Sequence, residues 1–366
     1  MNLLEQQLVY PMGETLPPAG TALDVAPGVR WVRMALPFAL DHINLWLLRD
    51  EIDGRPGWTI VDCCVARDEA RDQWAQVFLN ALDGLPVLRV IVTHMHPDHI
   101  GLASWLCDHW TTPGHECRLW ISATDYGLAK LSASSVSGFG GESAARFFAA
   151  HGLADMAAID AIRGRTTYYA DLVPGVPTTY RRMMDRDVIR IGGRDWHCIS
   201  GYGHAPEHIA LYCADTAAGT DHAGAAQPVL ISGDMVLPRI STNISVHDIE
   251  PEANPLALFL DSLDKYLPLP VNTLTLPSHG KPFQGLHTRI GQLHDHHRER
   301  LAEVLAACRE KPCSAADIVP VMFRRPLDHH QIAFAMGEAL AHLNKLWLQA
   351  LLVRQFQDGV YRFSAT

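Results

Sequence analysis

Four residues that can bind a metal ion occur within six consecutive positions, directly after a short apolar run. The run Val87–Val92 is typical of a buried strand, and residues 94–99 read HMHPDH. In an extended segment side chains alternate between two faces, so His94, His96 and Asp98 are predicted to point to one side. Imidazole and carboxylate groups form a ligand set suited to borderline and hard cations. This density of ligands predicts a metal centre.

Three later segments repeat the order of an apolar strand, a short turn and one metal-binding residue. They are Trp196–Ser200 before His204, Val229–Ile231 before Asp234, and Leu274–Leu276 before His279. Ligands carried on strand ends can converge at one edge of a sheet. The glycines beside these three ligands predict that backbone passes close to a bound ion.

This series of motifs resembles the metallo-β-lactamase superfamily, in which an H-x-H-x-D-H block is followed by a His, an Asp and a His on later strand ends. All seven positions are filled in order, and the resemblance covers about residues 25–285. It implies an α/β fold, the αββα metallo-β-lactamase sandwich. It also implies that Asp62, which ends the predicted strand Trp58–Val61, supports the metal site.

The resemblance implies a dinuclear metal centre. The first ion would be held by His94, His96 and His204, the second by Asp98, His99 and His279, and Asp234 would bridge them. The implied nucleophile is a metal-bridging hydroxide, because bound metal lowers the pKa of water from about 15.7 to about 7. Asp98 and Asp234 are the implied catalytic residues, and Asp98 would also orient the hydroxide. Two zinc ions per chain are expected, with iron or manganese as alternatives.

Residues around the ligands are also assigned roles by the resemblance. Asp62 would accept an N–H from a ligand histidine, and His208 would do the same or serve only in packing. Two departures from the family pattern stand out. Cys63 and Cys64 replace the usual Thr-Gly, and Glu207 replaces a glycine beside His208. These departures affect loop shape and substrate fit, and the cysteines are interpreted as buried small residues in preference to reactive ones.

The chain divides into a catalytic domain, residues 1–288, and a C-terminal module, residues 289–366. Within the first, residues 127–186 are interpreted as an insertion that covers the cleft. The module has three predicted helices and a hairpin turned at Asp358-Gly359. It resembles the winged-helix-like extension of the β-lactamase-like-protein-2 branch. The predicted third helix, Asp328–Trp347, is broadly apolar with Lys345 as its one formal cation, which predicts packing against the catalytic domain or in a homodimer and not binding to nucleic acid.

The substrate is constrained by the insertion. Its aromatic residues suit an apolar group; they are Phe139, Phe147, Phe148, Tyr168, Tyr169 and Tyr180. Its arginines suit an anionic group or surface ion pairs, and Arg181 and Arg182 are expected to affect KM. A small-molecule thioester or ester, acyl-CoA-like, is the favoured substrate. A lactonase is the second hypothesis. A phosphodiesterase or ribonuclease is the alternative of another class. A non-catalytic binder of a small molecule is the least favoured.

Composition excludes other classes. The formal net charge of −10 disfavours general affinity for nucleic acid and anionic membranes, and no apolar stretch is long enough to span a bilayer. The first 20 residues lack the features of a signal peptide, and eight scattered cysteines suit reduced thiols, so a cytoplasmic enzyme is expected. His294, His296 and His297 are interpreted as part of a solvated helix face in preference to a second metal site.

Overall fold

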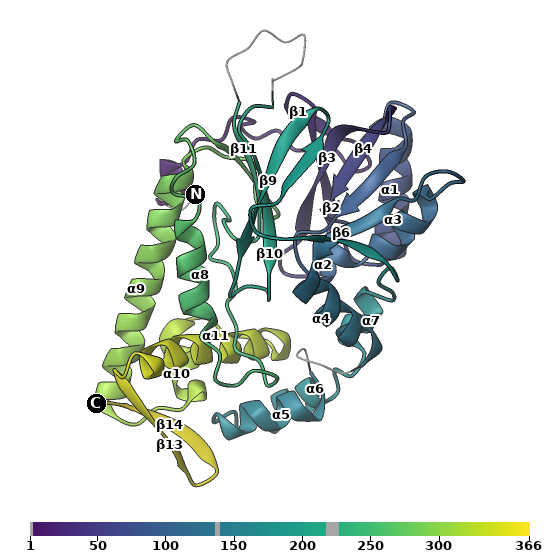
Figure 1. The fold of residues 1–366 in the computed structure, drawn as a ribbon. Coiled ribbons are helices and arrows are strands. Elements are labelled where there is room, and N and C mark those ends of the chain that lie inside the picture. Colours follow the sequence, from purple (N-terminus) through teal and green to yellow (C-terminus); the bar gives the residue numbers. More distant parts are fainter. Residues whose placement is uncertain (1–2, 136–139, 217–226) are drawn as a thin grey trace.

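The structure is a computed structural model and describes residues 3–135, 140–216 and 227–366. Two β-sheets form the centre of the molecule, with helices on their outer sides (Figure 1). The first sheet has the order β1 (Leu23–Ala26), β2 (Val29–Ala35), β3 (His42–Ile52), β4 (Arg55–Val61), β5 (Val87–Ile91), β6 (Arg118–Ser122), β7 (Tyr180–Met183). The second has the order β12 (Leu274–Pro277), β11 (Val229–Gly233), β10 (His208–Cys213), β9 (Arg194–Gly201), β8 (Val188–Ile191).

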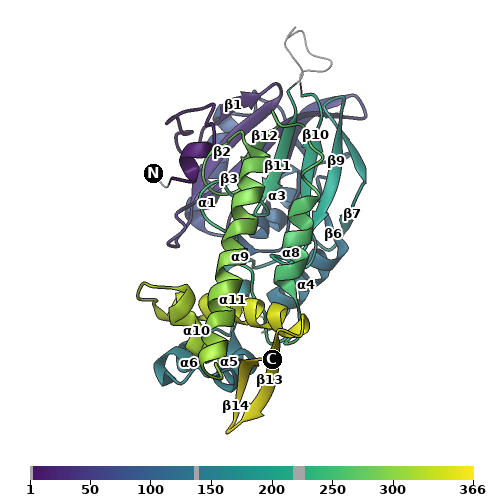
Figure 2. The same ribbon diagram turned by 90° about the vertical axis from the view of Figure 1, so that its left-hand side faces the viewer.

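Helices cover both sheets and build a separate lower part of the molecule. The first sheet is covered by α1 (Asp68–Asn80), α2 (Pro97–Ile100), α3 (Ala103–Trp110), α4 (Ala123–Ser134) and α7 (Tyr168–Leu172). The second sheet is covered by α8 (Pro255–Asp264) and α9 (Leu286–Glu310). Below both sheets lie α5 (Gly141–Ala150), α6 (Met156–Arg163), α10 (Ala315–Met322), α11 (His329–Leu348) and the hairpin β13 (Leu352–Gln357)–β14 (Val360–Ala365), as Figures 1 and 2 show. The short 3₁₀ helix η1 (Glu5–Gln7) precedes the first strand.

Apolar side chains fill three layers, which confirms the predicted αββα sandwich. Trp31, Trp46 and Leu48 of the first sheet lie between the sheets with Ile209 and Leu211 of the second. The outer face of each sheet carries its own cluster, buried under helices. Because strands buried on both faces lack a polar side, they appear as the nearly continuous apolar runs from which they were predicted.

Strand direction places several chain segments at one edge of the sandwich. Strands β4, β5, β6 and β7 pair in parallel, and so do β11 and β12. Their carboxyl ends therefore meet at the same edge. The backbone N–H of Asn44 in β3 donates to Ser278 O after β12 at 2.7 Å, and its side chain donates to Pro277 O at 2.8 Å. These bonds join the two sheets beside the edge.

Local signals at helix starts are confirmed by the structure. The Asn254 side chain accepts from Ala257 N, with Pro255 at the first position of α8. Ser314 and Asp317 form a capping box at the start of α10. Helix α9 runs continuously through residue 288, the predicted boundary between the two domains. The division into two domains stays a prediction. No helix in the described ranges combines the length and apolarity needed to cross a membrane.

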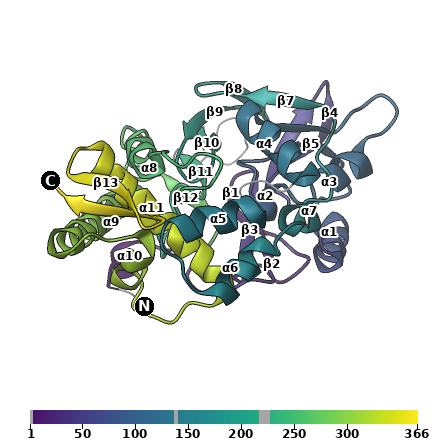
Figure 3. The same cartoon turned by 90° about the horizontal axis from the view of Figure 1, so that it is seen from below.

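The predicted insertion, residues 127–186, has two different parts. Helices α4 and α7 pack in the core of the first sheet, whereas α5 and α6 join the cluster built by the C-terminal helices. Ala316 N of α10 donates to His151 O at 3.2 Å, directly after α5. Figure 3 shows α5 lying across the lower face, next to α11. The part of the insertion that contains α5 and α6 therefore packs on the C-terminal module.

Helix α11 buries its apolar residues within this chain. Met336, Ala339, Leu340 and Leu343 are buried in the cluster shared with α8, α9 and the insertion. The predicted packing against the catalytic part is confirmed, and it requires no second subunit. A homodimer stays a prediction.

Candidate metal centre

The block after β5 is not extended along its whole length. Pro97 occupies the first position of the short helix α2, and His96 is the residue before it, with φ −61° and ψ 147°. Asp98 and His99 therefore lie on a helical turn. The prediction that His94, His96 and Asp98 share one side of an extended segment was wrong, because the two-residue period ends where the helix begins.

Three histidines bring ring nitrogens to a common point. His94 Nε2 lies 2.9 Å from His96 Nδ1, His96 Nδ1 lies 3.0 Å from His204 Nε2, and the third side of this triangle, His94 Nε2 to His204 Nε2, is 3.2 Å. His204 follows β9, 110 residues after His94. Three inward-facing nitrogens at these separations form one of the candidate groups for a metal ion.

A second group lies beside the first and shares Asp234 with it. His99 Nε2 and His279 Nε2 lie 3.6 Å and 3.5 Å from Asp98 Oδ2. Asp234 Oδ1 lies 3.6 Å from His99 Nε2 and 3.4 Å from His279 Nε2, whereas Asp234 Oδ2 lies 3.2 Å from His204 Nε2. One oxygen of Asp234 thus faces each group. All seven residues expected from the sequence are gathered at one edge of the sandwich.

Hydrogen bonds on the outer side of three rings determine which nitrogen faces inward. His99 Nδ1 lies 2.8 Å from Asp62 Oδ2, His279 Nδ1 lies 2.7 Å from His42 O, and His204 Nδ1 lies 2.8 Å from Asn243 O. Carboxylate and carbonyl oxygens only accept, so each Nδ1 carries a proton and, in the neutral ring, each Nε2 presents a lone pair. The expectation that Asp62 accepts an N–H from a ligand histidine is confirmed.

Two buried polar atoms at the centre have no hydrogen-bond partner among the described residues. They are His99 Nε2 and Asp234 Oδ1, and both belong to the groups above. A buried polar atom without a partner is costly, and a cation between these donors would satisfy both. The donors are nitrogens and carboxylate oxygens, which suit zinc, iron or manganese. The residues therefore fit the metal ions that the sequence predicts.

The charges of the site act on the same groups. Burial, together with the neighbouring His99 and His96, holds the pKa of His94 well below its ordinary value. Burial opposes protonation of His99 as well, but Asp62, Asp98 and Asp234 outweigh it and raise its pKa. Metal binding requires neutral imidazole, so it is coupled to release of a proton where the pKa is raised.

His208 contacts the backbone of Asp234. Asp234 N donates to His208 Nε2 at 3.2 Å, and burial with the neighbouring His204 lowers the pKa of His208 to about 3, which keeps the ring neutral. A Cβ atom at Gly233, where φ is +54°, would lie 2.0 Å from His208 Nε2. The glycine before Asp234 therefore makes room for this histidine.

A cavity of about 310 Å³ opens beside the candidate metal-binding groups and is lined by five of the seven candidate ligands. It is termed the main cavity. Its apolar lining consists of Phe38, Ala39, Leu40, Pro97, Leu237, Ile240 and Phe334. Its polar lining comprises Tyr168, Ser241, Thr242, Asn243, Ser245 and His247, together with the candidate ligands His96, Asp98, His204, Asp234 and His279. No lysine or arginine is among the described residues that line it. The cavity is suited to an uncharged, largely apolar group.

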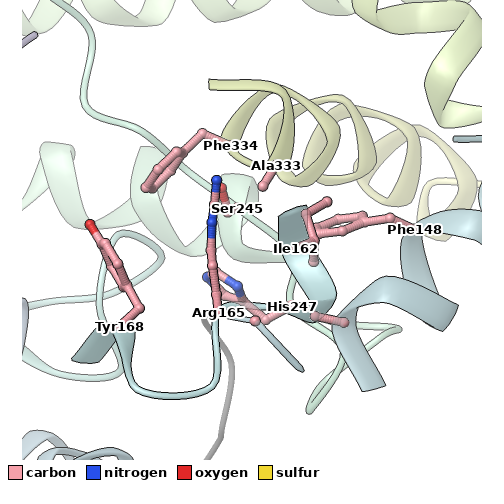
Figure 4. A pocket seen from close by; sticks show the side chains of 10 residues that line it. Phe148, Ile162, Arg165, Tyr168, Ser245, His247, Ala333 and Phe334 are labelled. Atoms are coloured by element: carbon pink, nitrogen blue, oxygen red, sulfur yellow. The ribbon is translucent and has the colours of Figure 1, made fainter. Parts of the chain in front are cut away.

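A smaller cavity adjoins the first and shares four of its lining residues, Tyr168, Ser245, His247 and Phe334. Arg165 lies at this junction, and Figure 4 shows its side chain pointing toward Ser245 and Phe334. Burial lowers the pKa of Arg165, and the Asp328 carboxylate opposes this effect. A cation therefore lies next to the apolar cavity.

Most of the insertion residues expected at the substrate lie elsewhere. Among the aromatic set, Tyr168 lines the main cavity and Phe148 the smaller one, whereas Phe139 lies outside the described residues. Arg181 and Arg182 are exposed on β7 and line neither cavity, and Arg181 stacks over Trp120. The edge strand β7 carries them on the outside of the first sheet, which favours a surface role over the binding of an anionic substrate group.

Comparisons with known proteins agree with this geometry. Residues 40–218 match the model of the metallo-beta-lactamase superfamily, and residues 301–366 match that of the metallo-beta-lactamase-like C-terminal domain. A beta-lactamase domain protein from Burkholderia ambifaria has a crystal structure with 56% sequence identity, full coverage of both chains and a TM-score of 0.90. The chain belongs to the metallo-β-lactamase superfamily.

Two proteins with lower sequence identity match this chain over most of its length. A metallo-beta-lactamase family protein from Thermus thermophilus is 24% identical, with a TM-score of 0.72 over 94% of this chain and all of the other. A probable metallo-hydrolase from Bacillus subtilis (strain 168) is 22% identical over 341 residues, 91% of this chain and 96% of that protein. The protein is accordingly a metal-dependent hydrolase with a C-terminal extension.

Sequence reasoning missed several residues around this superfamily site. His42 and Asn243 offer backbone oxygens to ligand histidines, and such contacts leave no signal in a side-chain pattern. Met95 N donates to the buried Asp125, which also accepts from Glu207 N, and no spacing rule pointed to this residue. His297 was expected on a solvated face, but it is fully buried against His342 of α11.

Proposed function

We propose that this protein is a dinuclear zinc-dependent hydrolase of a small ester or thioester with an apolar acyl part. The first ion would be held by His94, His96 and His204, the second by Asp98, His99 and His279, and Asp234 would bridge them. The two facing groups and the divided carboxylate of Asp234 support two ions. Iron or manganese would suit the same donors.

The observation that carries the proposal is the cavity beside Asp98 and Asp234. Its wall of apolar side chains lies directly next to these acidic groups. Apolar lining with a few placed polar groups is typical of small-molecule sites. An acyl chain would bury its surface there while its carbonyl carbon lies at the metal-binding edge. Arg165 at the adjoining cavity supports an anionic group on the remainder of the substrate.

Hydrolysis adds water to the carbonyl carbon, breaks the C–O or C–S bond, and gives a carboxylic acid and an alcohol or thiol. When bound, metal ions lower the pKa of water and polarise a carbonyl oxygen. Asp98 lines the cavity and can accept a hydrogen bond from the attacking water, which orients it. Tyr168 lies in the same cavity and can donate a hydrogen bond to the substrate. Asp62 keeps the His99 ring oriented throughout.

A lactonase is the second candidate, because a lactone presents the same carbonyl chemistry to the same apolar wall. A phosphodiesterase or ribonuclease is disfavoured, because the described lining of the main cavity offers no lysine or arginine to phosphate groups. Helix α11 also carries Lys345 in its last turn without a row of basic residues. Neither feature suits a nucleic-acid substrate.

The test is a substrate panel on zinc-loaded protein. Acyl thioesters including acyl-CoA, acyl esters, lactones, β-lactams and phosphodiesters should be compared by kcat/KM, with metal content measured on the same samples. The expected result is two ions per chain and highest kcat/KM for thioesters or esters. A single ion under metal-replete conditions would refute the dinuclear assignment, and preference for phosphodiesters would refute the substrate class.

A further inference from the structure

The segment between β11 and α8 has no regular secondary structure, and several of its residues line the main cavity. Its anchors come from the helices packed against it. Arg289 in α9 donates to Leu237 O at 2.6 Å and to Ile240 O at 2.9 Å. Asn344 in α11 donates to Pro251 O at 3.1 Å and to Ala253 O at 3.0 Å. The position of this segment therefore depends on α9 and α11.

Asn243 lies in the middle of the segment and contacts a candidate metal ligand. Its backbone oxygen accepts from His204 Nδ1 at 2.8 Å, which orients the ring and leaves Nε2 toward the other ligands. Its side chain is held on both sides. Asn243 Nδ2 donates to Glu338 Oε2 at 3.3 Å, and Ser245 Oγ donates to Asn243 Oδ1 at 2.8 Å.

The helix α11 approaches this segment very closely. Val246 N donates to Gly337 O at 3.1 Å, a bond between the segment and the helix backbone. A Cβ atom at Gly337 would lie 2.7 Å from Ser245 Oγ and 2.8 Å from Ser245 Cβ. A side chain at position 337 would therefore displace Ser245 and, with it, the support of Asn243.

The same face of α11 also reaches the substrate cavity. Phe334 lines the cavity, and it precedes Gly337 and Glu338 by three and four residues, which places all three on one face of the helix. Helix α11 belongs to the C-terminal part of the chain, far in sequence from every candidate metal ligand. One helix face thus supports a ligand partner and forms part of the apolar wall.

We propose that this face of α11 completes the active site: Gly337 and Glu338 position the Asn243 carbonyl that orients His204, and Phe334 determines which acyl groups fit. The proposal rests on the metal-dependent function proposed above. Glu338, Gly337 and Asn243 are positioning residues, and Phe334 is a specificity residue. Substitutions in α11 should therefore change metal affinity and acyl preference separately.

The first experiment measures zinc affinity of the full-length protein by competition with a chromophoric chelator. Glu338→Ala removes the acceptor for Asn243, and Gly337→Ala crowds Ser245, so each should weaken the binding of one ion by about 10–100-fold. Glu338→Gln keeps an acceptor oxygen and should bind zinc like the wild type. Cobalt-loaded Glu338→Ala should also show a changed visible absorption spectrum, because one histidine is reoriented.

Matched controls separate this effect from general loss of stability. Asn344→Ala removes bonds from the same helix to the far end of the same segment, at Pro251 and Ala253, so it should lower the Tm but weaken zinc binding less than Glu338→Ala does. Gly291→Ala in α9 adds a methyl group that meets no atom within 4 Å, so it should leave zinc affinity unchanged, and the Tm should rise slightly because alanine is a better helix former than glycine. Equal zinc affinity in the wild type, Glu338→Ala and Gly337→Ala would overturn the positioning role. So would equal losses in Glu338→Ala and Asn344→Ala.

The second experiment varies acyl chain length on the best substrate. Phe334→Ala should shift the preferred chain length and raise KM for the original substrate, with zinc affinity unchanged. An unchanged chain-length profile would overturn the specificity role. A wild-type protein that binds no zinc would refute the proposed function itself and this inference with it. Normal zinc binding with unaffected α11 variants would refute the inference alone.

Discussion

The two sheets and the α11 contact support the candidate ligand histidines in different ways. His99 and His279 donate to Asp62, at the end of β4, and to His42 O, at the start of β3. His204 instead donates to Asn243 O, in a segment without regular structure. Strand ends are held by the hydrogen bonds of the sheet, whereas the Asn243 segment is held by distant helices. Supports of the first kind are intrinsic to the sandwich, and the second kind couples the site to the C-terminal extension.

The largest effect is expected at Asp234, which faces histidines held by both kinds of support. Its two oxygens face the two groups, so Asp234→Ala should abolish binding of at least one metal ion and lower kcat/KM more than about a hundredfold. Elemental analysis and kinetics on the same preparation measure this. His197→Ala, which changes an exposed histidine of β9, is the control. Wild-type metal content in Asp234→Ala would show that the ligand assignment is wrong.

The next effect tests a support within the sheets. Asp62→Asn removes the charge that holds His99 Nδ1–H, so metal affinity should fall by about 10–100-fold. The same chelator competition measures it, with Asp195→Asn on the exposed side of β9 as control. The loss should not depend on whether Glu338 is also changed. If the double variant Asp62→Asn, Glu338→Ala shows much more than the sum of the two free-energy losses, the two supports are not independent.

A smaller effect concerns the cation next to the cavity. Arg165→Gln should raise KM for an anionic substrate by about tenfold with little change in kcat, since a hydrogen bond to a charged group contributes about 1.5 kcal/mol. Arg181→Gln on β7 should leave KM unchanged, because this side chain is exposed and lines neither cavity. Equal KM values for wild type and Arg165→Gln would remove Arg165 from the substrate site.

The smallest effect concerns the pH dependence of stability between α9 and α11. Burial first, and then neighbouring cationic groups, lower the pKa of His297 to about 2 and of His342 to about 4. A base whose pKa is lowered by folding contributes stability above its ordinary pKa of about 6.5 and loses it as the pH falls toward the folded value. When the pH falls from 7.5 to 5.5, the free energy of unfolding should therefore decrease by about 1 kcal/mol less in His297→Leu than in the wild type.

Urea unfolding of both proteins at the two pH values measures this difference. His294→Leu is the matched control, because His294 lies on the same helix and its side chain is about one-third exposed beside Asp264. The facing groups that oppose protonation of His297 are His342, His296, His294 and Lys345. Identical pH dependence in the wild type and His297→Leu would show that this buried pair does not titrate on unfolding.

The ligand-type residues at strand ends, and helix starts such as Asn254-Pro255, have local signals in the sequence. The sandwich and the support from Asp62 were predicted from the resemblance of these motifs to the superfamily. Strand period and strand direction then place such residues at one edge without further information. The same reasoning failed within the block itself, because Pro97 starts a helix and Asp98 and His99 lie on its first turn, where the two-residue period no longer applies.

The surroundings of those ligands could not be predicted from local patterns. The main cavity takes Phe38, Tyr168, Leu237 and Phe334 from four distant segments, and none has a sequence pattern that relates it to the others. Asn243 acts through a backbone oxygen, which every residue possesses, so its identity could not reveal its role. Packing of α11 against the Asn243 segment places these groups together, and such long-range contacts depend on the shapes of whole surfaces and not on local periodicity.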